Sequence, residues 1–133
     1  MIYLDSCALV KLVRTEECSE ALRTHVLRST AVLLSSELAH VEVGRALTRN
    51  GEGQPARDHA AVLLERIARL PLKGSIRHAA ALPGEHLRTL DALHLATAAM
   101  LGSTLTQFIT YDKRLAQAAF IEGLPVVTPG TIV

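Results

Sequence analysis

The stretch FITYDKRLAQAA, from Phe108 to Ala119, joins a short apolar run, one acidic residue and a helical segment. The run before Asp112 is typical of a buried strand, and the residues after it have the spacing of an amphipathic helix. A carboxylate at such a junction accepts hydrogen bonds from the free N–H groups of the first helical turn. Taken alone, Asp112 is therefore interpreted as a helix cap.

The same junction occurs at the start of the chain, where IYLD at 2–5 precedes a helical segment. Apolar runs predict strands at 2–5, 31–36, 107–110 and 125–128, with a further small strand near 70–72. Ser35 or Ser36 is expected to cap the helix after the second strand. Helices are predicted at 7–14, 17–29, 37–49, 56–70, 75–82, 87–101 and 112–121.

Strands that alternate with helices favour an α/β fold, in which a parallel sheet is covered on both faces and joined by right-handed crossovers. A length of 133 residues is close to the commonest size of one domain. We find no internal repeat and no low-complexity segment. The chain is therefore expected to form a single domain over residues 1–133.

The composition limits where the protein is expected to work. The chain is 49% hydrophobic, yet no apolar run approaches the ~20 residues that cross a bilayer, so no membrane association is expected. The opening MIYLDSC lacks the basic and apolar segments of a secretory signal, which favours an intracellular, cytoplasmic location. Cys7 and Cys18 are interpreted as reduced thiols, and no cysteine or histidine spacing indicates zinc.

The charge is small overall, +1, but uneven along the chain. Residues 45–88 contain eight Arg or Lys against four acidic residues. A solvated helix surface and a phosphate-bearing partner both explain this basic region. Aromatic residues are only 3% of the chain and Trp is absent, which disfavours base stacking. A nucleic acid would therefore be held mainly through its backbone.

Four acidic residues stand close to the predicted strand ends. Asp5 ends the first strand and Asp112 follows the strand at 107–110, while Glu42 lies about two turns into the helix after the second strand and Asp91 begins the most apolar helix. The carboxyl ends of parallel strands share one edge, where ligands bind. Carboxylates gathered there repel one another unless protons or cations neutralise them. Mg²⁺, which prefers oxygen ligands, is the natural solution.

Each acidic residue also has a simpler explanation. Glu42 can pair with Arg45 on a helix surface, and Asp91 can be a first-turn residue that the helix dipole favours. Asp5 is harder to explain as a solvated charge, because it follows a buried run. His94, within an apolar helix, is interpreted as a hydrogen-bonded core residue rather than a metal ligand. The metal-site hypothesis therefore depends on the four residues together.

The chain resembles the PIN-domain ribonucleases, in particular the VapC toxins of bacterial toxin–antitoxin pairs. The resemblance is carried by IYLDSCALVKL, SSELAHVEVGRAL, LRTLDALHLATA and FITYDKRLAQAA followed by GLPVVTPG. It implies a three-layer α/β/α sandwich with a mostly parallel sheet of four to five strands. It also implies a homodimer that is neutralised by a small VapB-like antitoxin. Cys7 departs from the pattern, since the family usually has Ser or Thr at this position.

The resemblance further implies that Asp5, Glu42, Asp91 and Asp112 are the catalytic residues and the ligands of Mg²⁺ or Mn²⁺ in an endoribonuclease acting on RNA. Such an enzyme activates water for in-line attack, does not use the 2′-hydroxyl, and leaves a 5′-phosphate and a 3′-hydroxyl. Two alternatives stay open: a metal-dependent phosphatase, although LDSC lacks the paired acids of a DxD motif, and a noncatalytic cation-binding module. Phosphate contacts and simple surface solvation explain the basic residues near the acids equally well: Arg45, Arg88, Lys113 and Arg114.

Overall fold

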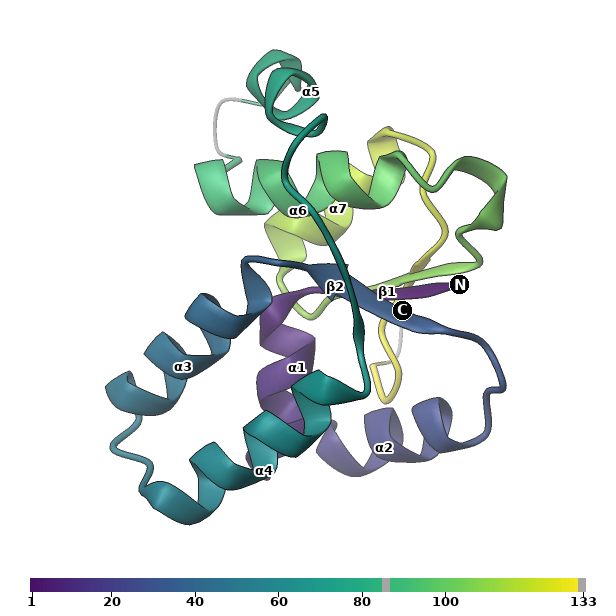
Figure 1. Ribbon diagram of the computed structural model, residues 1–133. Helices are drawn as coiled ribbons and strands as arrows, with labels where there is room; N and C mark the ends of the chain where they lie inside the picture. The colour runs from purple at the N-terminus through teal and green to yellow at the C-terminus, as the bar shows by residue number, and fades with distance from the viewer. Residues whose placement is uncertain (85–86, 132–133) are drawn as a thin grey trace.

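The computed structural model describes residues 1–84 and 87–131, in which one sheet lies between two layers of helices (Figure 1). The sheet consists of β1 (Ile2–Leu4), β2 (Leu33–Ser36), β3 (Ala68–Leu70), β4 (Gln107–Ile109) and β5 (Val126–Val127). The strand order is β3-β2-β1-β4-β5 and each neighbouring pair is parallel. The predicted α/β class and the parallel three-layer arrangement are confirmed.

The helices of the described residues are α1 (Ser6–Val13), α2 (Ser19–Leu27), α3 (Ala39–Arg49), α4 (Gln54–Glu65), α5 (Ile76–Ala81), α6 (Thr89–Ala99) and α7 (Lys113–Ile121). Figure 1 shows α1 to α4 below the sheet and α5 to α7 above it. None of the helices in this part of the chain is both long and apolar enough to cross a bilayer.

Two hydrophobic clusters fill the spaces between the sheet and its helices. Ile2 and Leu4 pack with α1, α3 and α4 in the first cluster, whereas Tyr3 packs with α6 and α7 in the second. This alternation follows from the pleat of a strand, which turns successive side chains to opposite faces. In the second cluster the rings of Tyr3 and Phe108 stack with their centroids 5.4 Å apart. β1 is therefore buried on both faces.

The prediction of one helix over 56–70 was wrong. α4 ends at Glu65, and Ala68–Leu70 forms β3, which pairs with β2. The small strand therefore lies just before the predicted 70–72. The amphipathic spacing of this segment does favour a helix, but residues 68–70 instead pair with the edge of β2, where their backbone groups find hydrogen-bond partners. A non-local contact has overridden the local pattern.

The predicted serine cap of α3 was also wrong. α3 begins at Ala39 and has no side-chain cap. Ser36 Oγ instead accepts a hydrogen bond from the Leu38 N–H before the helix, and Ser35 Oγ donates to the Leu4 carbonyl. These hydrogen bonds hold the end of β2 against β1 and against the turn before α3, which fixes where α3 leaves the sheet.

The strand order creates a switch point between β1 and β4. From β1 the chain proceeds to β2 and β3 on one side, and it later fills the other side with β4 and β5. In open parallel sheets the crevice for ligands lies outside the carboxyl ends of the strands at such a point. The register pairs Leu4 with Ile109, so Asp5 and Thr110 emerge side by side at this edge.

Candidate active site

A hollow of about 750 Å³ lies at the switch point, and all four predicted acidic residues line it. Asp5 comes from the end of β1, Glu42 from α3, Asp91 from the first turn of α6, and Asp112 from the junction between β4 and α7. Side chains from opposite ends of the sequence thus face one space. The local strand-to-helix junctions and the parallel sheet together produce this convergence.

Asp5 is almost completely buried, with 3% of its surface exposed. Its Oδ1 accepts a hydrogen bond from the Ala8 N–H at 2.9 Å, which caps α1, and Thr110 Oγ1 donates to Oδ2. Desolvation raises the pKa of the Asp5 carboxyl, and this outweighs the opposing effects of the His94 charge and of the hydrogen bonds. The ionised side chain is therefore costly in the folded protein without a cation.

Cys7, which departs from the family pattern, still supplies a polar contact to Asp5. Its thiol donates to Asp5, with Sγ 3.0 and 3.1 Å from the two carboxylate oxygens, and its sulfur accepts from the Tyr111 N–H. Burial and the Asp5 charge raise the pKa of the Cys7 thiol well above its ordinary value. The thiol therefore stays protonated and keeps donating to Asp5.

Glu42 is held by His94 and not by Arg45. His94 Nε2 lies 2.6 Å from Glu42 Oε1, and Ser6 Oγ donates to Oε2 at 3.1 Å. On the other side of the ring, Nδ1 of His94 lies 2.7 Å from the Tyr3 hydroxyl. Burial lowers the pKa of His94, but the hydrogen bond to Glu42 and nearby negative charges raise it more. The interpretation of His94 as a hydrogen-bonded core residue agrees with these contacts.

The contacts of His94 with Tyr3 and Glu42 predict energetic coupling. His94→Leu leaves the buried Tyr3 hydroxyl and Glu42 without this partner, which costs roughly 1–3 kcal/mol of unfolding free energy. Adding Tyr3→Phe removes the stranded hydroxyl, so the double variant should lose less than the sum of the two single losses. We expect a coupling of about 1 kcal/mol in a double-mutant cycle followed by urea unfolding. Strict additivity would contradict the hydrogen bond.

Arg88 joins the remaining two acidic residues. Its Nε lies 3.0 Å from Asp91 Oδ2 and its Nη2 lies 2.9 Å from Asp112 Oδ2. Asp112 Oδ1 accepts from the backbone N–H groups of Arg114 and Leu115. One oxygen of Asp112 therefore caps α7, as the local pattern predicts, while the other is turned toward Arg88.

The four carboxylates share the hollow without meeting at one point. Within residues 1–84 and 87–131, no three Asp, Glu, His or Cys side chains are close enough together to hold one ion in this arrangement. Asp91 and Asp112 instead both pair with Arg88, and Glu42 faces His94. An ion bound by this set would have to take the place of the Arg88 guanidinium.

Sequence reasoning missed several residues of this hollow. Glu16 lines it, and its carboxylate is paired with Lys11 and Arg14. Arg49 also lines it, seven residues after Glu42 and so on the same face of α3. That spacing of seven residues was the signal in the sequence that could have placed Arg49 beside the site. Tyr3 does not line the hollow but contacts His94, and no signal in the sequence indicated this contact because the two residues lie 91 positions apart.

The fold and the hollow define a class: a parallel α/β protein whose carboxylates surround the switch point of the sheet. The model of the PIN domain family matches residues 2–121. Ribonuclease VapC35 of Mycobacterium tuberculosis (strain CDC 1551 / Oshkosh) is 44% identical over 135 residues, which cover 98% of each chain. Ribonuclease VapC46 of strain ATCC 25618 / H37Rv is 45% identical over 133 residues, covering 96% of this chain and 97% of the relative.

A solved structure has the same fold at much lower sequence identity. The crystal structure of Mycobacterium tuberculosis VapC20, described as a Sarcin-Ricin loop cleaving toxin, superimposes with a TM-score of 0.69 over 94% of this chain and 100% of the other, at 17% identity. The chain therefore belongs to the PIN-domain family, and its near full-length relatives are VapC ribonucleases.

Proposed function

We propose that the protein is an endoribonuclease toxin of the VapC kind, which hydrolyses RNA phosphodiester bonds with the help of Mg²⁺ or Mn²⁺. The observation that carries the proposal is the buried Asp5 at the end of β1, in one hollow with Glu42, Asp91 and Asp112. The family relationship to ribonucleases supports RNA as the substrate and disfavours the phosphatase and the noncatalytic module.

The donor set fits a hard divalent cation. All four acidic side chains offer carboxylate oxygens, which Mg²⁺ and Mn²⁺ prefer. The cost of ionising Asp5 in its buried position is one that a nearby cation relieves. A bound divalent ion supplies the positive charge that activates water and stabilises charge on a phosphodiester group. Asp5, Glu42, Asp91 and Asp112 are proposed as its ligands.

The other residues of the hollow have supporting tasks in this proposal. Thr110 and Cys7 donate hydrogen bonds to Asp5 and thereby fix the orientation of its carboxylate. His94 and Ser6 do the same for Glu42. Arg88, with 67% of its side chain exposed, is able to leave the acidic residues and bind a substrate phosphate instead.

The chemistry of the products tests the proposal. Purified protein incubated with a structured RNA and Mn²⁺ is expected to leave 5′-phosphate and 3′-hydroxyl ends, because attack by water does not involve the 2′-hydroxyl. An RNA carrying a 2′-O-methyl group at the cleavage site should still be cut there. The ends are identified by mass spectrometry of the fragments. A 2′,3′-cyclic phosphate would contradict the proposal, as would cleavage that stops completely on 2′-O-methylation.

We also propose the setting that the family implies: one domain over residues 1–133, a cytoplasmic homodimer, and neutralisation by a small VapB-like antitoxin. Exposed apolar side chains support a protein interface, since Phe120 and Ile121 at the end of α7 are 75% and 68% exposed. Analytical ultracentrifugation of the wild type and of Phe120→Glu tests the dimer.

A further inference from the structure

The wall of the hollow that is formed by α3 changes from acidic to basic along the helix. Glu42, Arg45 and Arg49 lie three and four residues apart and all line the hollow, so they share one face of α3. A helix rises about 1.5 Å per residue, which places the two arginines about 6 Å apart along the axis. Asn50, which follows the helix, also lines the hollow.

Both arginines lack a partner within the described part of the chain. Neither forms an ion pair or a side-chain hydrogen bond there. By contrast, Arg14, the residue after α1, pairs with Glu16 and Glu52. The nearest acid on the same face of α3, Glu42, is held by His94 and Ser6. Both arginines line the hollow, and each keeps the five N–H donors of its guanidinium group available for an anion.

The lining also decides how a nucleic acid would be held. No aromatic side chain lines this hollow among the residues that the structure describes. The described lining therefore offers no aromatic face for base stacking, whereas contacts to phosphates provide position without selecting sequence. Along α3, Glu42 comes first and the two arginines follow, so the charge pattern of this helix separates a region for cleavage from a region for holding the strand.

We propose that Arg45 and Arg49 bind consecutive phosphates of a single RNA strand on one side of the cleaved bond. The strand then runs along α3 from Glu42 toward Asn50. This inference rests on the proposed ribonuclease function and adds the path of the substrate. An arginine fork matches the geometry of a phosphate group, so each residue contributes one backbone contact.

The salt dependence of RNA binding tests this path. Binding of a short fluorescein-labelled single-stranded RNA is measured by fluorescence anisotropy in EDTA, where the proposed cleavage cannot interfere. The variant Arg45→Gln/Arg49→Gln should bind about tenfold more weakly, and the slope of log K against log salt should decrease by about 1.4, since each lost phosphate contact removes about 0.7. In each single variant the slope should decrease by about 0.7, half as much as in the double variant.

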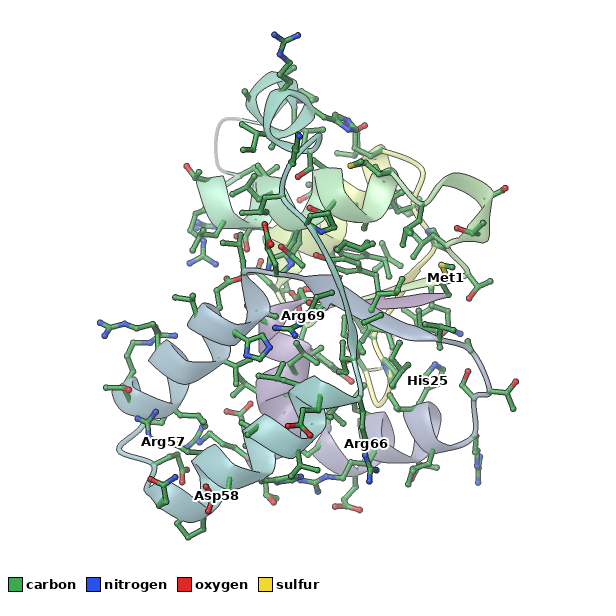
Figure 2. The ribbon with its side chains drawn as sticks, in the orientation of Figure 1. Met1, His25, Arg57, Asp58, Arg66 and Arg69 are labelled. Carbon is green, nitrogen blue, oxygen red and sulfur yellow. The ribbon has the colours of Figure 1, made fainter. Side chains whose placement is uncertain are left out.

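Arg66→Gln provides the matched control. Arg66 is exposed directly after α4 (Figure 2) and does not line the hollow. It should leave the slope and the affinity unchanged. An unchanged slope in the double variant, or no RNA binding by the wild type in EDTA, would overturn the inference.

Cleavage assays separate this inference from the proposed function. With Mn²⁺, the double variant is expected to raise KM about tenfold and to change kcat less than threefold. A wild type that binds RNA with the arginine-dependent slope but never cleaves it would refute the proposed function and leave the binding path intact. Cleavage that is normal in the double variant would refute the path alone.

Discussion

Asp5→Asn is expected to reduce RNA cleavage at least about a hundredfold while making the folded protein more stable. Loss of roughly 2.7 kcal/mol of transition-state stabilisation corresponds to that factor, and a proposed metal ligand contributes several kcal/mol. Asparagine has nearly the same shape as aspartate and keeps an oxygen that accepts from the Ala8 N–H, so the cap of α1 is preserved. Removing a buried charge removes its desolvation cost.

The stability gain should depend on pH in a defined direction. The folded pKa of Asp5 is raised, so the folded state binds more protons than the unfolded state between the two pKa values. The wild type therefore loses stability as the pH rises from about 3.9, the ordinary Asp value, through the folded pKa. The asparagine of the variant cannot ionise, so the stability advantage of Asp5→Asn should grow from acidic to neutral pH.

Calorimetric Tm values at several pH values, together with initial cleavage rates, check both expectations. At neutral pH and without metal we expect Asp5→Asn to melt a few degrees higher, since about 1 kcal/mol shifts the Tm of such a domain by several degrees. Asp58→Asn is the control, because Asp58 lies near the start of α4 (Figure 2) and does not line the hollow. Normal cleavage by Asp5→Asn would show that the site is misassigned.

Much of the fold was predictable because its signals are local. Asp5 and Asp112 stand between a strand and a helix, and in the structure each accepts backbone hydrogen bonds at the start of a helix. The parallel sheet then follows from the alternation of elements, which brings the two residues to one edge. By contrast, β3 depends on pairing with the edge of β2. The periodicity of residues 56–70 contains no information about that edge.

The partners of the acidic residues were harder to predict, because they are set by packing across the sheet. Nothing in the sequence near Glu42 favours His94 over Arg45, which is closer along the helix. The contact arises because Tyr3 and His94 pack together, with their rings edge to face at 5.8 Å. Arg88 was predicted only as a general phosphate contact, and its bridge between Asp91 and Asp112 requires the folded arrangement.

Removal of divalent metal is expected to reduce cleavage at least about a thousandfold, since the cation supplies several kcal/mol of charge stabilisation. The same ion should stabilise the fold independently of any RNA. A ligand at a hundred times its Kd adds about 2.7 kcal/mol to the unfolding free energy, which corresponds to a Tm increase on the order of 10 °C for a domain of this size. Calorimetry with Mn²⁺ and with chelator measures this difference.

The identity of the ligands predicts which variants lose the Mn²⁺ effect. Asp5→Asn and Asp112→Asn should show little or no rise of Tm with Mn²⁺, whereas Asp58→Asn should behave as the wild type. Arg88→Gln should bind Mn²⁺ more tightly, because the guanidinium that neutralises Asp91 and Asp112 is removed and no longer has to be displaced. Equal Mn²⁺ stabilisation of wild type and Asp5→Asn would place the ion elsewhere, whatever the cleavage rates.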